Sequence, residues 1–291
     1  MTITVGFETT YKEQEARWEV NLNGSRVLEY VYGAVEDPNP SFRLVKTTGG
    51  ETITVYRPWD HPWHPGMFFS WKYINGLNFW ESMYHGQKNI AVTDSFTPIE
   101  EDGTGFRQDL SYVTYEGKTI LKEKREVIVE EESGGYVIHW QGSFTPTEGD
   151  ITLDRTENTE QSPWGGYAGL SCRLNRNFLG PIITTDLGEL TAEDAFGKSF
   201  KWCDYTGKLD GYIEEHFAGV CLFDHPSNLR HPSPKLTYDY KDMQFLSAAF
   251  LYDEPYVVKQ GETLTLNYTF FVHDGKAAEE GLNAIFDKIR G

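Results

Sequence analysis

Basic residues, cysteines and long apolar runs are all scarce in this chain of 291 residues. Its 26 lysines and arginines stand against 44 aspartates and glutamates, which gives a net charge of −18. Nucleic acids and anionic membrane surfaces bind basic patches, so this balance argues against both as partners. No apolar run approaches the roughly 20 residues of a membrane-spanning helix. The start, Met1 to Glu8, lacks the basic and apolar segments of a signal peptide, so we expect none.

Cysteine is limited to three positions, Cys172, Cys203 and Cys221. An odd number with wide spacing fits neither a disulfide framework nor a zinc-ribbon pattern. We therefore expect the three thiols to be small apolar strand residues, in a protein of the reducing cytoplasm.

Aromatic residues make up 15% of the chain, and the hydrophobic pattern is that of strands. In 136–142, alternation places Tyr136, Ile138 and Trp140 on one face of a strand. The Asn23-Gly24 pair predicts a tight hairpin between 16–24 and 26–32. Further strands are expected over 42–45 and 52–56 as a second hairpin, and over 89–96, 104–115, 119–131, 217–223 and 263–272.

Only the end of the chain has helical spacing. Ala278, Leu282, Ile285 and Ile289 fall on one helical face, with Asp274 or Gly275 as the expected cap. No repeat or linker divides the chain, so the expected fold is one all-β domain over 1–291. Its architecture would be a large antiparallel β-sandwich with a short C-terminal helix.

The first candidate site is the segment 57–71, which contains His61 and His64 among three prolines and several aromatics. Proline restricts the backbone, so the two imidazoles are expected on a stiff rim. Near neutral pH, histidine suits acid–base chemistry. The His-x-x-His spacing, with Asp60, Glu81 or His85, is also compatible with a metal site. A third interpretation is structural, with both rings bonded to backbone carbonyls.

A second segment, 223–232, repeats the pattern of histidines directly before prolines. It contains Asp224, His225, Asn228 and His231, at a point where the chain leaves a strand. Loops at strand ends often carry ligand groups, and these side chains could bind several sugar hydroxyls. The alternative is a rigid turn in which Asp224 and Asn228 bond their own backbone.

Two further features are candidates for the same pocket. His139 lies in a strand, opposite the apolar face, where a structural role is the alternative. In 163–173, Trp164 and Tyr167 could stack on a sugar ring, and the glycines allow close backbone approach. Arg173 could pair a carboxylate in the core or a ligand anion.

Several blocks in order resemble one family. They are the residues 60–71 and 75–80, and then 166–173, 202–207, 219–232 and 261–275. Together they resemble the bacterial PmoA-like family, a domain of unknown function. Trp63 and Pro65 stand where that family typically has histidine and arginine, which weakens a metal or anion site there and favours aromatic stacking by Trp63.

The resemblance implies a galactose-mutarotase-like supersandwich and a role in sugar metabolism, since such proteins tend to accompany sugar oxidoreductases and isomerases. A fold does not fix an activity, however. The prediction is therefore a carbohydrate-active protein that uses histidine and carboxylate acid–base chemistry, of epimerase, lyase or hydrolase type. The alternatives are a non-catalytic carbohydrate-binding module and a metal-dependent enzyme with His61 and His64 as ligands.

The predicted site joins both histidine segments across one groove, with no cofactor and no metal. His64 is the predicted partner in proton transfer of His231 or Asp224, with His139 on the same concave face. Residues 59–80 would form one wall and the 224–232 turn the opposite wall. The predicted sugar contacts are His61, Trp63, Asn75, Trp80, Trp164, Tyr167, Arg173, His225 and Asn228.

Overall fold

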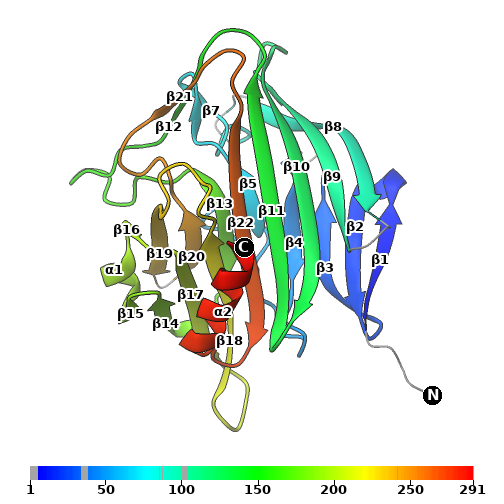
Figure 1. Ribbon diagram of the computed structural model, residues 1–291, viewed down its shortest axis with the longest axis vertical. Helices are drawn as coiled ribbons and strands as arrows, with labels where there is room; N and C mark the ends of the chain where they lie inside the picture. Colours follow the sequence, from blue (N-terminus) through cyan, green and yellow to red (C-terminus); the bar gives the residue numbers. More distant parts are fainter. Residues whose placement is uncertain are drawn as a thin grey trace.

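Alternating apolar residues on long strands pack two antiparallel sheets face to face (Figure 1). The computed structural model describes residues 6–33, 39–84, 86, 88–99, 104–240 and 242–290. Within these residues each large sheet has nine strands, and a four-stranded sheet lies beside them. The fold is therefore the all-β sandwich that the sequence predicts.

The strands of the first sheet are, in spatial order, β1 (Phe7–Lys12), β2 (Arg17–Leu22), β3 (Ser25–Val31), β4 (Ser41–Val45), β5 (Met67–Ser70), β13 (Gly169–Leu174), β20 (Met243–Ala248), β19 (Pro234–Tyr240) and β16 (Lys198–Ser199). Those of the second are β15 (Gly188–Leu190), β14 (Leu179–Thr185), β17 (Trp202–Leu209), β18 (His216–Asp224), β22 (Leu264–Asp274), β11 (Gly135–Pro146), β10 (Thr119–Glu132), β9 (Thr104–Val113) and β8 (Ile90–Ile99). The third sheet contains β21 (Tyr256–Val258), β12 (Ile151–Asp154), β6 (Tyr73–Ile74) and β7 (Leu77–Asn78).

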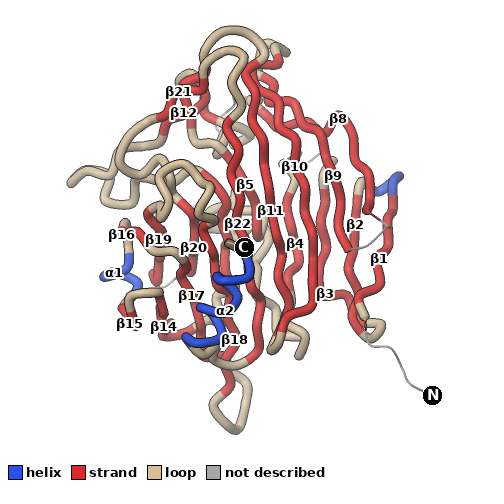
Figure 2. Tube along the Cα trace, in the orientation of Figure 1, coloured by secondary structure: helices blue, strands red, loops and turns tan. Residues whose placement is uncertain are grey.

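Helix contributes little, as the blue segments of Figure 2 show. Apart from a 3-10 turn (Glu13–Glu15), the described residues contain α1 (Ala192–Ala195) and α2 (Glu279–Ile289). Helix α2 confirms the predicted C-terminal helix, but its N-cap is Ala278 and not Asp274 or Gly275. Asp274 instead belongs to β22, and its carboxylate accepts a hydrogen bond from the backbone of Gly49 at 2.8 Å. Among the described residues no helix has the length and apolar character to cross a membrane.

The first hairpin has the predicted geometry. Asn23 and Gly24 have φ values of 52° and 76°, the left-handed pair that a type I′ turn requires between β2 and β3. The second predicted hairpin is only partly correct. Its first arm is β4, and Thr52 of the second arm pairs with Lys46 as the hairpin requires. The rest of 52–56 forms isolated bridges elsewhere, since Thr54 pairs with Leu174 of β13 and Tyr56 with Pro65.

The central strands confirm the predicted alternation. Tyr136, Ile138 and Trp140 of β11 face the core between the sheets, while Val137 points outward and is buried beneath α2. Cys172, Cys203 and Cys221 are buried and free, on β13, β17 and β18.

Each large sheet also has a covered outer face. Helix α2 packs on the second sheet through Leu282, Ile285 and Phe286. The outer face of the first sheet carries a separate apolar cluster that includes Phe68 and Phe245. Adjacent side chains on β5 divide between the two layers, because Phe69 belongs to the core and Phe68 to this outer cluster. Long loops lie beside β19 and β20, in tan in Figure 2, and the candidate site lies in this outer layer.

Candidate functional site

A cavity of about 310 Å³ lies over the outer face of the first sheet. Segment 57–66, the loop before β13 and strands β19 and β20 contribute to its walls. The lining residues are His61, Trp63, His64, Trp80, Glu81, Trp164, Tyr167, Tyr238, Met243 and Phe245. Six of these ten are residues that the sequence predicts for the site: His61, Trp63, His64, Trp80, Trp164 and Tyr167.

Segment 57–66 is a series of tight turns held by its own backbone. The amide of His61 donates to the carbonyl of Pro58 at 3.1 Å, and that of His64 to the carbonyl of His61 at 2.9 Å. Gly66, with φ of 98°, ends the segment where a Cβ would lie 2.3 Å from the Phe42 carbonyl oxygen. This close approach requires glycine. The turns stack the His61 and His64 rings with centroids 4.8 Å apart.

The His61 ring is oriented by a carboxylate. Its Nδ1 lies 2.7 Å from Asp60 Oδ2, so an Nδ1–H donor leaves Nε2 as the proton acceptor. Arg173 Nη2 donates to the same Asp60 oxygen at 2.7 Å, and Arg176 donates to the other oxygen. Burial alone would raise the pKa of Asp60, but the bonds from His61 and Arg173 outweigh it and lower this pKa to about 2. Asp60 is therefore a permanent anion behind His61.

His64 differs from its neighbour, although it belongs to the same turn. Its ring is buried and stacks on Phe245 at 5.1 Å. Burial, with the nearby charges of His61 and Arg173, places the pKa of His64 well below the usual histidine value. Its Nδ1 is buried and has no hydrogen-bond partner among the described residues. His64 is thus a neutral imidazole in the wall of the cavity.

A second group of charged residues includes Glu81. The Tyr167 hydroxyl donates to Glu81 Oε1 at 2.9 Å, and Lys72 Nζ donates to Oε2 at 2.5 Å. Burial, followed by the charge of Glu81, raises the pKa of Tyr167, so its phenol stays protonated. Both carboxylate oxygens of Glu81 therefore have protein partners.

Aromatic rings form most of the remaining wall. Trp80 lies edge-on to His64 and to Tyr167, with centroids 6.0 and 5.0 Å away. The Tyr238 hydroxyl donates to the carbonyl of Trp164 at 2.6 Å and holds the loop before β13. The sequence analysis did not single out Tyr238, Met243 and Phe245. They come from β19 and β20, which reach the cavity only through sheet pairing with β13.

Four predicted sugar contacts do not line the cavity, namely Asn75, Arg173, His225 and Asn228. Asn75 forms a turn between β6 and β7, where its side chain accepts from the Thr152 amide at 2.7 Å. This role is structural, because the Asn75-Gly76 turn has positive φ at both residues. Arg173 lies fully buried on β13 and pairs with Asp60, the carboxylate option of its prediction.

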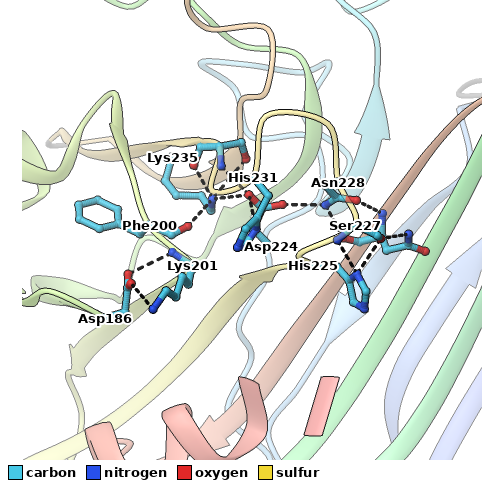
Figure 3. A network of polar contacts seen from close by, with 11 residues as sticks. Asp186, Phe200, Lys201, Asp224, His225, Ser227, Asn228, His231 and Lys235 are labelled. Carbon is cyan, nitrogen blue, oxygen red and sulfur yellow. Dashed lines mark hydrogen bonds and ion pairs between the residues drawn. The ribbon is translucent and has the colours of Figure 1, made fainter. Parts of the chain in front are cut away.

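The 224–232 turn is not the opposite wall of the cavity, which corrects the prediction for Asp224, Asn228 and His231. Asp224 is buried at the end of β18 and lies between Asn228 and Lys235 (Figure 3). Its Oδ1 accepts from Asn228 Nδ2 at 2.7 Å and its Oδ2 from the Ser233 amide at 2.6 Å. The Lys235 Nζ lies 3.6 Å from Oδ2. The His231 ring packs parallel to Phe286 of α2.

His139 and His225 lie on the outer face of the second sheet. They line a different cavity of about 320 Å³, together with Gln141, Asn267 and Lys288. His139 Nδ1 is 2.8 Å from the Thr269 hydroxyl. His225 Nε2 is 3.0 Å from the Ile289 carbonyl, at the end of α2. The predicted groove with all five histidines is therefore wrong, because the two sheets separate them.

Only some of the ligands predicted for a metal site at His61 and His64 can be located in the structure. His61 and Asp60 bond to each other, whereas His85 lies outside the described residues. Within the described ranges, no group of three or more histidine, cysteine, aspartate or glutamate side chains has a metal-binding arrangement.

Comparisons with known proteins give little beyond the family. No curated protein matches the sequence. The structure is similar to heparan sulfate lyase HepC from Pedobacter heparinus, with a TM-score of 0.40 and 10% identity, over 94% of this chain and 36% of that one. The chain thus spans about a third of the lyase. It is also similar to the Slr1438 protein from Synechocystis sp. PCC 6803, with a TM-score of 0.40 and 12% identity, over 94% of this chain and 99% of that one.

Structural similarities with a TM-score of 0.40 do not identify the function of the site. The family comparison extends over nearly the whole sequence, since residues 17–287 match a family described as of unknown function, DUF6807. The PmoA-like resemblance stays a prediction beside that match. By this match, the chain belongs to the DUF6807 family of unknown function.

Proposed function

We propose that this protein binds a sugar or keto-glycoside in the cavity of the first sheet and acts on it by acid–base chemistry. One observation carries the proposal. The His61 imidazole lies at an aromatic-walled cavity with its Nδ1 2.7 Å from Asp60, which Arg173 holds in turn. An imidazole oriented by a carboxylate is an effective proton acceptor near neutral pH.

The composition of the cavity supports a sugar as the ligand. A volume of about 310 Å³ is at the lower end of the roughly 300–1,000 Å³ of small-molecule sites. Trp63, Trp80 and Tyr167 offer apolar ring faces, while Glu81 and the histidines offer hydrogen bonds. A sugar ring presents this same combination, with C–H faces and hydroxyl edges. Among the described lining residues the carboxylate is Glu81, and it already pairs with Lys72, which favours a neutral ligand.

The two imidazoles have different roles in this proposal. His61 Nε2 accepts a proton from a hydroxyl group or from a carbon next to a carbonyl, and its conjugate acid returns the proton to a ring or leaving-group oxygen. His64 stays neutral because burial lowers its pKa, so it contacts the developing charge as a neutral hydrogen-bonding group. Glu81 and Tyr167 bind hydroxyl groups.

Incubation with a panel of sugars and 3-keto-glycosides, followed by NMR, tests the proposal. We expect a new product with the wild type, and a rate reduced about 10²–10⁴-fold in His61→Ala. His225→Ala is the matched control, since His225 lies on the other sheet. Equal rates in the wild type and His61→Ala would reject His61 as the base.

A non-catalytic binding module is the second candidate. The observation that favours it is that both oxygens of Glu81 already have partners, Tyr167 and Lys72, so only one acid–base group is complete. Saturation-transfer NMR separates the two candidates. A sugar that binds but is neither epimerised nor cleaved would support the module.

We further infer that residues 1–291 form one domain, which is supported by the central apolar cluster, whose members extend from Trp18 to Val272. The cytoplasmic location of the protein stays a prediction.

A further inference from the structure

We infer that the mouth of the cavity is a second subsite, and that the ligand is a glycoside of two or more sugar units. This inference rests on the proposed function and adds the substrate class. One terminal ring would enter the cavity, and the next unit would lie on exposed aromatic side chains at its rim. The rim is defined here as Trp59, Trp164 and Tyr240.

The position of the exposed tryptophans carries the inference. All eight tryptophans of the chain lie among the described residues. Only two of them are exposed, Trp59 at 74% and Trp164 at 47%. Trp164 lines the cavity, and Trp59 precedes Asp60 and His61 directly. Exposed aromatic rings that gather at one cavity are typical of a binding surface.

Trp59 has a cation over its ring. The Arg176 guanidinium lies over its ring at 5.6 Å from the centroid, and Arg176 is itself fixed by Asp60. One face of the indole is thus covered by the cation, and most of the ring remains exposed. An oriented ring of this kind loses little conformational entropy when a ligand stacks on it.

Trp164 and Tyr240 are held in a similar way. The Trp164 carbonyl accepts from the Tyr238 hydroxyl at 2.6 Å, and its ring lies 6.1 Å from that of Tyr167. Tyr240 is 61% exposed, and its ring lies 5.8 Å from Tyr238, which lines the cavity. Each rim residue therefore contacts a group that faces or supports the cavity.

The volume of the cavity explains why the rim is needed. About 310 Å³ corresponds to a small ligand on the scale of known sites, which suits one sugar ring. A second unit would extend past the mouth, where the rim rings lie. Nucleotides also stack on aromatics, but the net charge of −18 opposes a polyanionic ligand. A neutral glycoside stacks on aromatic rings and is not repelled by the negative net charge of the protein.

Titration with sugars of increasing length tests the inference. The probes are glucose, maltose, maltotriose, cellobiose, cellotriose, xylobiose, N-acetylglucosamine and chitobiose, with binding followed by calorimetry and saturation-transfer NMR. We expect at least one di- or trisaccharide to bind about tenfold or more tightly than its monosaccharide. Trp59→Ala should weaken the binding of that longer sugar about tenfold, in line with the strength of aromatic stacking. The same variant should leave monosaccharide binding unchanged.

Tyr115→Ala is the matched control, since Tyr115 is 57% exposed but lies in the turn between β9 and β10. Tyr240→Ala provides a second rim variant if Trp59→Ala misfolds. Equal affinity for monosaccharide and longer sugars, with no effect of either rim variant, overturns the inference and leaves the proposed function in place. Binding of none of the eight sugars also overturns the inference, and the panel of 3-keto-glycosides then decides the proposed function.

Discussion

Two segments of this protein have similar sequences but different environments. Residues 57–66 and 224–235 each contain two histidines directly before prolines, with an aspartate next to the first histidine. In the first segment His61 lines a cavity and bonds Asp60. In the second, Asp224 is fully buried within a network that includes Asn228 and Lys235 (Figure 3).

The difference shows what distinguishes a site from a structural network. Both aspartates have a lowered pKa: burial opposes the shift in each case, and nearby cations and hydrogen bonds outweigh it. A perturbed carboxylate therefore does not identify a site by itself. What distinguishes the two aspartates is the imidazole beside each carboxylate, since His61 next to Asp60 lines a cavity while His231, 3.6 Å from Asp224, packs on Phe286.

The largest expected effect is on stability, at Asp224. Asp224→Ala leaves the fully buried Lys235 with its charge uncompensated. Loss of one partner of such a pair costs about 3–5 kcal/mol. We expect the free energy of unfolding in urea to fall by that amount. The double variant Asp224→Ala/Lys235→Met should recover part of the loss, and a single-variant loss under about 1 kcal/mol would contradict the structural role.

A crossed pair of histidine variants tests function and stability together. His61→Ala should reduce product formation about 10²–10⁴-fold, and should change the free energy of unfolding by less than about 1 kcal/mol because the ring is partly exposed. His231→Ala should leave product formation unchanged and lower the free energy of unfolding by more than about 1 kcal/mol, since it removes a ring beside Phe286. Parallel assays of turnover and urea unfolding measure both. If His231→Ala alone abolished turnover, the assignment of the two segments would be wrong.

The two aspartates also predict how stability depends on pH. A carboxyl group with a lowered folded-state pKa adds stability above its unfolded pKa, which is about 3.9. That stability is lost as the pH falls through the folded pKa, which for Asp60 is about 2. The free energy of unfolding should therefore decline from about pH 5 to pH 2.

Neutral variants separate the two contributions. Asp60→Asn and Asp224→Asn should each flatten part of this acid limb in urea unfolding at several pH values. An unchanged slope in both variants would show that other carboxylates control the acid limb.

The smallest expected effect concerns His225. Its Nε2 bonds the Ile289 carbonyl at the end of α2, and His225→Ala should lower stability by about 0.5–1.5 kcal/mol. Hydrogen exchange should accelerate in the last turn of α2 and stay unchanged around His61. Protection at Phe286 equal to that of the wild type would show that the bond does not hold the helix.

The strands were the predictable part of the fold, because each depends on local alternation. The 136–142 pattern correctly placed Tyr136, Ile138 and Trp140 in the core. The arm 52–56 was only partly predictable. Thr52 pairs locally with Lys46, but Thr54 and Tyr56 pair with Leu174 and Pro65, and these pairings depend on the assembled sheet.

The residues of the candidate site also divide into those that could be predicted from the sequence and those that could not. Residues within the Pro-rich and Gly-rich segments, such as His61 and Trp164, could be selected from sequence because their composition is unusual. Tyr238 and Phe245 could not, since they lie on ordinary strands that reach the cavity through pairing with β13. The burial of Asp224 depends on Lys235 of β19 and on pairing with Tyr268 of β22, which lies far away in the chain.

The division between Phe68 and Phe69 on β5 has a consequence for how this protein can change over time. Because the cavity belongs to an apolar cluster separate from the central core, substitutions in its walls leave the packing between the sheets intact. Selection can then alter ligand preference without a large loss of folding stability. Laboratory evolution of new specificities should accordingly concentrate on the outer layer, with the sandwich as an unchanged scaffold.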